Sequence, residues 1–288
     1  MSSRKILNNI LKVVVSCLAV YYVVSRIDIA EIMEKVRSAD ILLLLAALAA
    51  YTISQLAASF RLRNLFNLVP ITITQKENIK LYWLGLFYNL FLPGGVGGDG
   101  FKVYLLGKYK KSNLKTVIGA ILSDRVSGLS IIVILLLVFI PMLDYNIPFK
   151  NLAWVAIPLV AAAFYLFLYI VNKKLLPAFP RVMGWAICVQ LLQMLSAVLI
   201  MASLHIDARH MYDAYLFLFF LSAIAGSLPI TLGGVGAREV VFLWGAQYLG
   251  VNEGSAIALS LLFYTSSAIT ALPGIIYTIK PSAILKVN

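Results

Sequence analysis

Apolar residues gather in nine runs, separated by shorter segments that hold most of the charged side chains. Six runs are long enough to cross a hydrocarbon core of about 30 Å as helices. The other three are short and flank two segments rich in glycine. The long runs cover residues 6–24, 41–60, 117–140, 152–171, 185–204 and 256–279, and the short runs cover 79–92, 215–228 and 240–249.

The composition also indicates a protein that crosses a membrane. Hydrophobic residues make up 61% of the chain and charged residues 12%, and the mean hydropathy is +0.92. A soluble domain with this composition could not cover its surface with polar groups. We therefore expect an all-α polytopic membrane protein that forms a single integral membrane domain over residues 1–288. No polar stretch exceeds about 20 residues, so we expect no appended soluble domain.

The two glycine-rich segments are copies of one pattern. Residues 92–102 read LPGGVGGDGFK and residues 228–238 read LPITLGGVGAR, and the two align without a gap. A leucine, a proline, three glycines and a basic residue coincide. This match predicts two related halves, at about 41–140 and 185–280. Glycine and proline are common in membrane helices, so a chance match is the alternative.

The charges predict how the chain crosses the membrane. Most of its 24 Lys and Arg residues fall on one side if both glycine-rich segments turn back within the bilayer. The positive-inside rule makes that side cytoplasmic. We therefore expect about six full spans plus two re-entrant helical hairpins, cytoplasmic N- and C-termini, and a location in the inner (cytoplasmic) membrane of the cell.

This threading places the two hairpins on opposite sides. The first, at about 76–107, enters from the cytoplasm, and the second, at about 212–249, enters from the other face. The repeat is therefore predicted to be inverted. Inverted repeats with interrupted helices that meet near the bilayer midplane are an architecture of transporters, and the interruptions mark the substrate site.

Several other functions are disfavoured. The net charge of +12 lies beside hydrophobic spans, as expected for a membrane protein, and does not indicate nucleic acid as a partner. His205 and His210 lack Cys or carboxylate neighbours at metal-ligand spacing, so we expect no metal. Neither glycine-rich segment has the spacing of a nucleotide-binding loop, so ATP is not the direct energy source. We expect no cofactor.

Ionisable residues at membrane depth are costly and need a partner or a wet cavity. Glycines let the backbone approach a ligand closely, and the N-terminus of the helix after each glycine-rich segment would favour an anion such as phosphate. Arg61 and Arg63, at a cytoplasmic helix end, can reach anionic lipid. The candidate substrate-binding residues are Gly97, Gly98, Asp99, Lys102, Asp124, Arg125, Gly233, Gly234, Gly236, Arg238, Glu239, Arg61 and Arg63.

The same charges allow other roles. Asp99, Asp124 and Glu239 can serve only to neutralise Lys102, Arg125 and Arg238 and so hold broken helices together. The three carboxylates can also couple transport to a proton or ion. Charge balance alone does not separate these hypotheses from lipid binding.

Four segments together resemble a known family. FRLRNL, LPGGVGGDGFKVYLL, SDRVSGL and LPITLGGVGAREVVFLW are similar to the membrane domain of lysylphosphatidylglycerol synthases and to stand-alone YbhN-like proteins, often described as flippase-like. The resemblance places a GGD motif on Gly97, Gly98 and Asp99, and a DR motif on Asp124 and Arg125. A glycine-rich motif followed by Arg-Glu falls on Gly236, Arg238 and Glu239. Lys102 departs from the Arg that the family has more often, which weakens a bidentate grip on phosphate.

The resemblance implies lipid transport rather than an enzyme. In the synthases this domain precedes a soluble aminoacyl-transferring domain, which we do not expect here, so lysyl transfer is not assigned. We expect a lipid flippase or transporter that moves an anionic phospholipid or a polyprenyl-phosphate-linked lipid between leaflets, with its headgroup between the two glycine-rich elements. A non-transporting scaffold for a glycosyltransferase or other lipid-modifying partner is the alternative. An intramembrane lipid-phosphate enzyme is disfavoured because no His or Cys lies near the glycine-rich segments.

Overall fold

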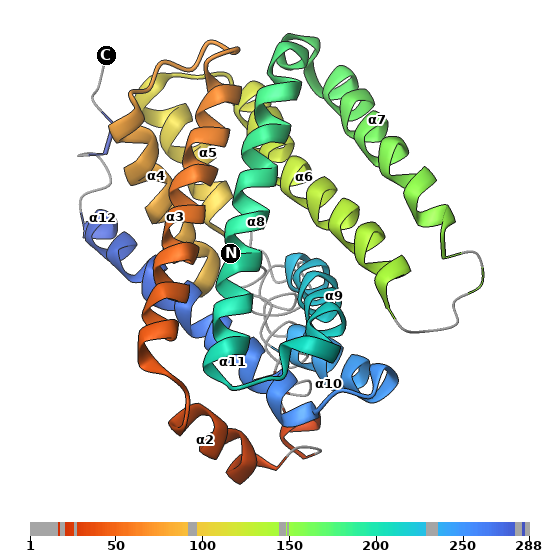
Figure 1. Cartoon of the computed structure of the whole chain (residues 1–288). Coiled ribbons are helices and arrows are strands. Elements are labelled where there is room, and N and C mark those ends of the chain that lie inside the picture. The colour runs from red at the N-terminus through yellow and green to blue at the C-terminus, as the bar shows by residue number, and fades with distance from the viewer. Residues whose placement is uncertain are drawn as a thin grey trace.

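The protein folds as a bundle of helices (Figure 1). The computed structural model describes residues 17, 21–25, 28–91, 97–143, 148, 150–228, 236–279 and 284–285. All regular secondary structure in these residues is helical, which confirms the predicted fold class. Most of the first predicted span, residues 6–24, and part of each glycine-rich segment, residues 92–96 and 229–235, lie outside the described residues.

Most of the described helices overlap a predicted apolar run, whereas the helices at 29–37 and 97–110 lie between runs. The described helices are α2 (Ile29–Arg37), α3 (Ile41–Phe66), α4 (Gln75–Phe91), α5 (Gly97–Lys110), α6 (Leu114–Phe139), α7 (Leu152–Asn172), α8 (Phe179–Ser203), α9 (Ala208–Ser227), α10 (Ala237–Leu249), α11 (Glu253–Ala271) and α12 (Ile276–Ile279). Short 3-10 turns η1 (Ile140–Met142), η2 (Lys173–Ala178) and η3 (Leu272–Ile275) extend α6, join α7 to α8 and join α11 to α12.

Four continuous helical stretches in the described part of the chain are long and apolar enough to cross a membrane. These are Ile41–Phe66, Leu114–Met142, Leu152–Ser203 and Glu253–Ile279. The third contains both α7 and α8. Large apolar side chains also face outward, such as Leu42 at 72% exposure and Ile170 at 73%. Such a surface is what a lipid environment requires.

Polar side chains at the N-caps explain where several helices begin. Asp40 accepts a hydrogen bond from the Leu42 N–H at 2.8 Å at the start of α3. Asn113 does the same for the Lys115 N–H at 3.0 Å in α6, and Asn252 for the Ser255 N–H at 2.7 Å in α11. These side chains satisfy backbone donors that have no partner within the helix.

Helices α3 and α8 form an antiparallel pair at the centre of the bundle (Figure 1). The Asp40 N–H donates to the Ser203 carbonyl at 3.1 Å, and the Ser196 hydroxyl donates to the Ala47 carbonyl at 2.8 Å. At the other end, the rings of Phe60 and Trp185 stack 5.5 Å apart. Small residues and serine hydroxyls let membrane helices approach closely and bond directly.

Helices α4 and α5 form a hairpin that is open at the end of the bundle where α3 finishes. The ammonium of Lys110, at the end of α5, lies 3.4 Å from the carboxylate of Glu77, near the start of α4. Gly98 packs on Gly85 near the other ends of the two helices. The end of α4 and the start of α5 therefore point into the bundle.

Helices α9 and α10 form a second hairpin, open at the opposite end (Figure 1). Gly245 packs on Leu218, and Gly226 packs on Arg238, so the two helices are antiparallel. Helix α9 follows directly from α8, whose last residue bonds to Asp40 at the start of α3. The end of α9 and the start of α10 therefore point inward, toward the first hairpin.

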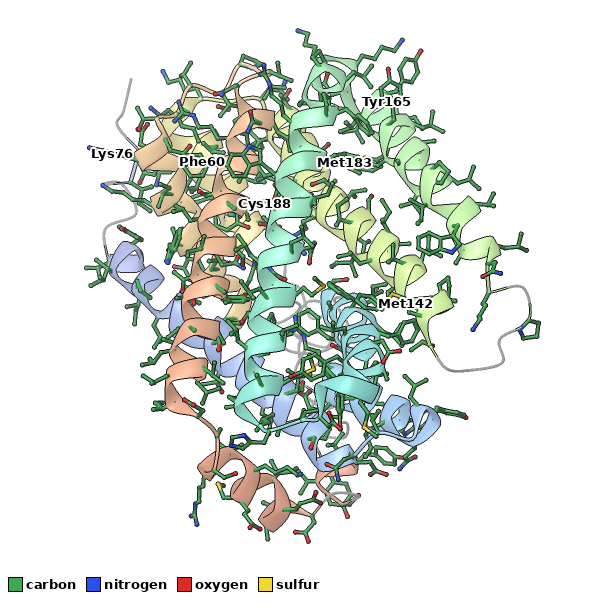
Figure 2. The ribbon with its side chains drawn as sticks, in the orientation of Figure 1. Phe60, Lys76, Met142, Tyr165, Met183 and Cys188 are labelled. Carbon is green, nitrogen blue, oxygen red and sulfur yellow. The ribbon has the colours of Figure 1, made fainter. Side chains whose placement is uncertain are left out.

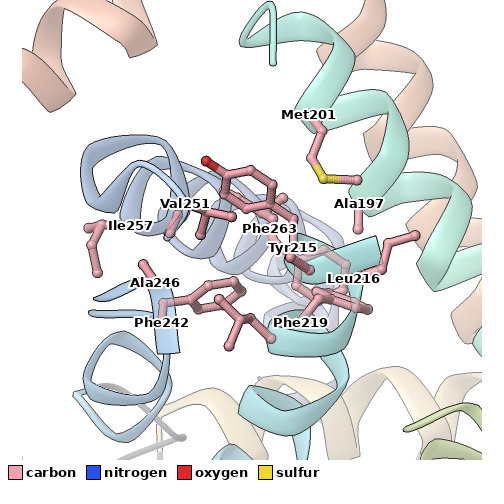
Figure 3. Close-up of a cluster of buried hydrophobic side chains, with 14 of the residues drawn as sticks. Ala197, Met201, Tyr215, Leu216, Phe219, Phe242, Ala246, Val251, Ile257 and Phe263 are labelled. Carbon is pink, nitrogen blue, oxygen red and sulfur yellow. The ribbon is translucent and has the colours of Figure 1, made fainter. Parts of the chain in front are cut away.

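Two apolar cores occupy the two ends of the bundle. The α9–α11 core includes Tyr215, Phe219, Phe242, Ala246 and Phe263, together with Ala197 and Met201 from α8 (Figure 3). The α4–α6 core includes Leu81, Leu84, Leu105, Leu106 and Val117, and it continues into α3 and the first half of α8. Phe60 and Met183 lie toward the latter end in Figure 2, and Met142 lies toward the other.

Helix α7 stands at the edge of the bundle, packed beside α6 (Figure 1). Only Phe164 and Leu168 are buried along its length. Leu159 and Ile170 remain 65% and 73% exposed. Most of its surface is therefore left to the surrounding solvent, which for such apolar side chains is lipid.

Candidate substrate-binding site

A layer of buried polar residues separates the two apolar cores. Helices α3, α6 and α8 each cross from one core to the other, and each carries polar side chains in the middle of its length. Such groups are costly at this depth unless they are paired or face a wet cavity. The layer contains Ser54, Gln55, Asp124, Ser127, Gln190 and Ser196, all buried.

Arg61 and Asp124 form a buried bidentate ion pair between α3 and α6. The Arg61 Nε donates to Asp124 Oδ1 at 2.7 Å, and Nη2 donates to Oδ2 at 3.2 Å. The third nitrogen, Nη1, is buried and has no hydrogen-bond partner within the described part of the chain. It lies beside Gly128, where an added Cβ would be 3.1 Å away. A buried donor without a protein partner is rare, and such a donor is able to bind a ligand or a water molecule.

Asp99 connects the start of α5 to α6. Its Oδ1 accepts from the Lys102 ammonium at 3.0 Å, and its Oδ2 accepts from Arg125 Nε. Asp99 and Lys102 are buried, whereas the Arg125 side chain is 35% exposed. One carboxylate therefore binds two cations.

The pairing differs from the simplest sequence hypothesis. One of the hypotheses from the sequence pairs Asp124 with its neighbour Arg125, but Asp124 binds Arg61, and Arg125 binds Asp99. Adjacent residues on a helix point in directions about 100° apart and do not face each other, which explains the exchange. The two ion pairs join α3, α5 and α6 at the polar layer.

Helix α4 contacts both Lys102 and the N-terminus of α5. The Lys102 ammonium lies 4.5 Å from the centre of the Tyr82 ring, a cation–π contact. The side-chain Oδ1 of Asn89 accepts the Gly98 N–H at 2.8 Å and so satisfies one free donor of α5. At least one of the backbone N–H groups that we expect to bind an anion at this helix N-terminus therefore bonds to a protein side chain instead.

A cavity of about 350 Å³ opens beside these groups. It lies between α3, α6 and α8 and reaches Tyr82 on α4 and the end of α9. Both Arg61 and Arg125 line it, as does Gly128. Its volume falls in the range of small-molecule sites. The polar residues of its lining are Gln55, Arg61, Tyr82, Arg125, Gln190, Gln193 and Ser227.

The second hairpin places its charged residues differently. The carboxylate of Glu239 accepts the Gly236 N–H at 2.7 Å and the Ser260 hydroxyl at 2.9 Å. Gly236 has φ of +85°, which favours glycine. Arg238 Nε lies against Gly226, buried and without a hydrogen-bond partner in the described residues. Thus the carboxylate of Glu239 caps the N-terminus of α10.

The structure gathers only some of the candidate residues at the cavity. Arg61 and Arg125 line it, and Asp99 and Asp124 bind them directly. Arg63 lies near the end of α3 and donates to Gln75 at 3.4 Å, away from the cavity. Gly97 and Gly98 begin α5, and Gly233 and Gly234 lie outside the described residues. Their role in binding stays a prediction.

Sequence reasoning missed Gln55, Gln190 and Gln193. Each is an amide within an otherwise apolar helical run, and a polar side chain in such a run is itself a signal because of its cost in lipid. The candidate residues from the sequence are all charged residues or glycines, and so contain no amide. In the residues that the structure describes, no group of three His, Cys, Asp or Glu side chains could hold a metal ion.

The fold and the cavity define a multi-pass helical membrane protein with two arginines that line a cavity within its bundle. The family described as lysylphosphatidylglycerol synthase TM region matches residues 9–185, and the chain belongs to this family. The match includes Asp99, Lys102, Asp124 and Arg125 but ends before the second glycine-rich segment.

Curated relatives point to the same family. The chain is 27% identical over 177 residues to a phosphatidylglycerol lysyltransferase of Staphylococcus aureus strain COL. It is 29% identical over 178 residues to the protein of the same name in Staphylococcus haemolyticus strain JCSC1435. Each match covers 59% of this chain but only 21% of the relative. Most of the length of each relative therefore lies outside the matched region.

Proposed function

We propose that this protein is a lipid transporter, which moves an anionic phospholipid or a polyprenyl-phosphate-linked lipid between the two leaflets. The headgroup would occupy the cavity lined by Arg61 and Arg125. The single observation that carries the proposal is the buried Arg61 guanidinium at that cavity, one nitrogen of which has no hydrogen-bond partner among the described residues. A phosphate oxygen is the natural acceptor for such a nitrogen.

The charges around the cavity support an anionic ligand. Asp99 binds Lys102 and Arg125 together, and Asp124 binds Arg61. Among the described residues, three cations thus share two carboxylates, and one of the three, Arg125, is partly exposed. A phosphate in the cavity would place a negative charge beside these cations, which favours its binding.

The arrangement of the hairpins supports movement across the bilayer. The α4–α5 and α9–α10 hairpins open at opposite ends of the bundle, and both contribute residues to the cavity, Tyr82 from α4 and Ser227 from α9. We propose that both are re-entrant elements of an inverted repeat, with the cavity near the midplane. Rocking of one half against the other would expose the cavity to each leaflet in turn.

We further propose that the protein lies in the inner membrane with both termini in the cytoplasm. The side formed by the ends of α3 and α5 and the start of α6 carries a concentration of basic residues, among them Lys108, Lys110, Lys111 and Lys115. By the positive-inside rule, this side faces the cytoplasm.

Two other functions fit less well. A scaffold for a lipid-modifying partner does not need a polar cavity within its own bundle, whereas this cavity is lined by two arginines and three glutamines. The curated relatives are named as lysyltransferases. Because the match covers only 21% of those proteins, lysyl transfer is not part of our proposal for this chain.

Transport can be measured with fluorescent lipids in proteoliposomes of the purified protein. We expect Arg125→Gln and Asp99→Asn each to slow the crossing of an anionic lipid by about tenfold or more, because each removes a charged hydrogen bond at the cavity. Lys108→Gln is the matched control, since Lys108 is exposed and lies outside the cavity. Unchanged rates in both cavity variants, with intact folding, would remove these residues from transport and contradict the proposal.

A further inference from the structure

The lysine-rich end of the bundle, where α3 and α5 finish, has a cavity of its own. Its volume is about 470 Å³, and it lies between residues 67–74, which join α3 to α4, the start of α4 and the end of α5. We propose that this cavity binds an acidic, extended peptide segment of a partner protein, which pairs with residues 71–74 as an added β-strand. The inference goes beyond lipid transport and does not depend on it.

One wall of the cavity is an extended stretch of chain. Residues 69–74 read VPITIT, and every second side chain is buried while the others are exposed. This alternation is that of a β-strand with one face packed on a core. The buried members are Val69, Ile71 and Ile73, each at 8% exposure or less, and all belong to the α4–α6 core. The core therefore holds the segment in place.

The backbone of this segment is open to pairing. Within the described residues, the N–H groups of Thr72 and Ile73 donate no hydrogen bond, and the carbonyl groups of residues 71–73 accept none. A row of unpaired N–H and C=O groups is a template for another strand. An isolated pair of strands is only marginally stable. Here one strand is already fixed by its packing, so less order has to be gained when a peptide binds.

The opposite wall contains a buried ion pair between the two helices of the first hairpin. The Lys110 ammonium lies 3.4 Å from the Glu77 carboxylate, and the two side chains are 4% and 9% exposed. Glu77 also accepts the Thr74 N–H at 2.6 Å, which fixes the end of the extended segment against the start of α4. Both walls are therefore held in place by the protein's own contacts, which lowers the cost of binding a peptide between them.

The charges at this end favour an acidic peptide. Glu77 is the only acidic residue in the sequence between positions 41 and 98, and it is bound to Lys110. Lys76 and Lys111 are next to the two members of this pair in the sequence, and both are exposed. A strand that carries Asp or Glu on its outward side would be attracted to these ammonium groups, whereas a basic strand would be repelled.

Peptide binding can be measured by fluorescence polarisation with the full chain in phosphatidylcholine nanodiscs. The probes are labelled peptides of about six residues that alternate valine with glutamate or valine with lysine, and the glutamate peptide N-methylated throughout, which cannot donate backbone hydrogen bonds. We expect the unmethylated glutamate peptide to bind at least about tenfold more tightly than either of the others. Equal affinities, or no binding of the glutamate peptide, would overturn the inference.

Hydrogen exchange shows where the peptide binds. The amides of Thr72 and Ile73 have no hydrogen-bond partner in the part of the chain that the structure describes. With the glutamate peptide bound, we expect at least one of them to exchange about tenfold more slowly, because a paired amide is protected. Unchanged exchange of both amides at saturating peptide would place it elsewhere and contradict the added strand.

Variants separate the backbone from the charges. Thr72→Pro removes one backbone donor and should weaken binding of the glutamate peptide by about tenfold. Thr72→Val keeps that donor and is the matched control. Lys76→Glu/Lys111→Glu should weaken the same peptide by about tenfold through repulsion. Its control is Lys174→Glu, at an exposed position of η2 between α7 and α8. Equal affinities in Thr72→Pro and Thr72→Val would contradict backbone pairing.

The double lysine variant keeps the test decisive if Thr72→Pro does not fold. Wild-type affinity in that variant would contradict the proposed selection for an acidic peptide. Thr72 does not line the cavity at the polar layer, so lipid crossing in proteoliposomes should be the same in Thr72→Val, Thr72→Pro and the wild type. Loss of peptide binding with normal crossing therefore concerns this surface alone, and failure of the lipid assay leaves the peptide result standing.

Discussion

The backbone of Gly98 on α5 lies directly against the backbone of Gly85 on α4. A Cβ atom built at position 98 would overlap the carbonyl group of Gly85, and one built at position 85 would overlap the Lys102 side chain. The two helices can approach this closely only because both residues lack a side chain. This contact positions Asp99, the next residue, beside Arg125.

A first prediction follows from that contact. Gly98→Ala should destabilise the protein by about 1–3 kcal/mol, because the added methyl group meets backbone that cannot turn away. Gly100→Ala is the matched control: it is on the same helix, and an added Cβ there meets nothing within 4 Å. Thermal denaturation of both variants in lipid nanodiscs measures the difference. Equal denaturation temperatures would contradict the close approach of α4 and α5.

The Arg61–Asp124 pair predicts strong energetic coupling. Arg61→Met or Asp124→Leu alone should cost about 3–5 kcal/mol, because each leaves a buried charge without its partner. The double variant should cost less than the sum of the two. A double-mutant cycle in unfolding free energy checks this. Additive effects would show that the two residues do not form the pair.

Glu239 is predicted to be structural. Glu239→Ala should lower stability by about 1–3 kcal/mol, because the Gly236 N–H and the Ser260 hydroxyl lose their acceptor. Glu239→Gln keeps a carbonyl oxygen and should lose less. Both variants, where folded, should transport lipid at the rate of the wild type. A slower rate in a well-folded Glu239→Gln variant would instead place this carboxylate at the substrate.

The orientation of the bundle can be tested with single cysteines in a Cys17→Ser/Cys188→Ser background. Lys115 lies at the start of α6 and Ser38 at the end of α2, on opposite ends of the bundle, and both are exposed. We expect Lys115→Cys to react with a membrane-impermeant thiol reagent only from the cytoplasmic side, and Ser38→Cys only from the other. Labelling of both from one side would contradict the threading.

Much of the fold could be predicted from the sequence, because a helix in lipid must be apolar along its whole length. The run at 152–171 became Leu152–Asn172, and the run at 41–60 became a helix that continues through Arg61 to Phe66. The number of spans and the re-entrant character of the hairpins stay predictions. The short helices α5 and α10 fit such hairpins by length.

The site could be predicted only in part. Arg125, Asp99 and Asp124 could be identified because a charged side chain is costly at membrane depth. It could not identify their partners, because Arg61 and Asp124 meet only through the packing of α3 on α6. The glutamines of α8 were passed over because an amide carries no charge. The glutamines and the arginines line the same cavity only because their helices pack together. A sequence pattern within one helix does not show that packing.

The isolation of α7 bears on how this protein must be handled. Only two of its side chains are buried, so acyl chains, rather than neighbouring helices, complete its packing. Harsh delipidation during purification would strip α7 of its natural solvent first and loosen its hold on α6. Preparations that retain annular lipid are therefore the right starting point for every measurement above.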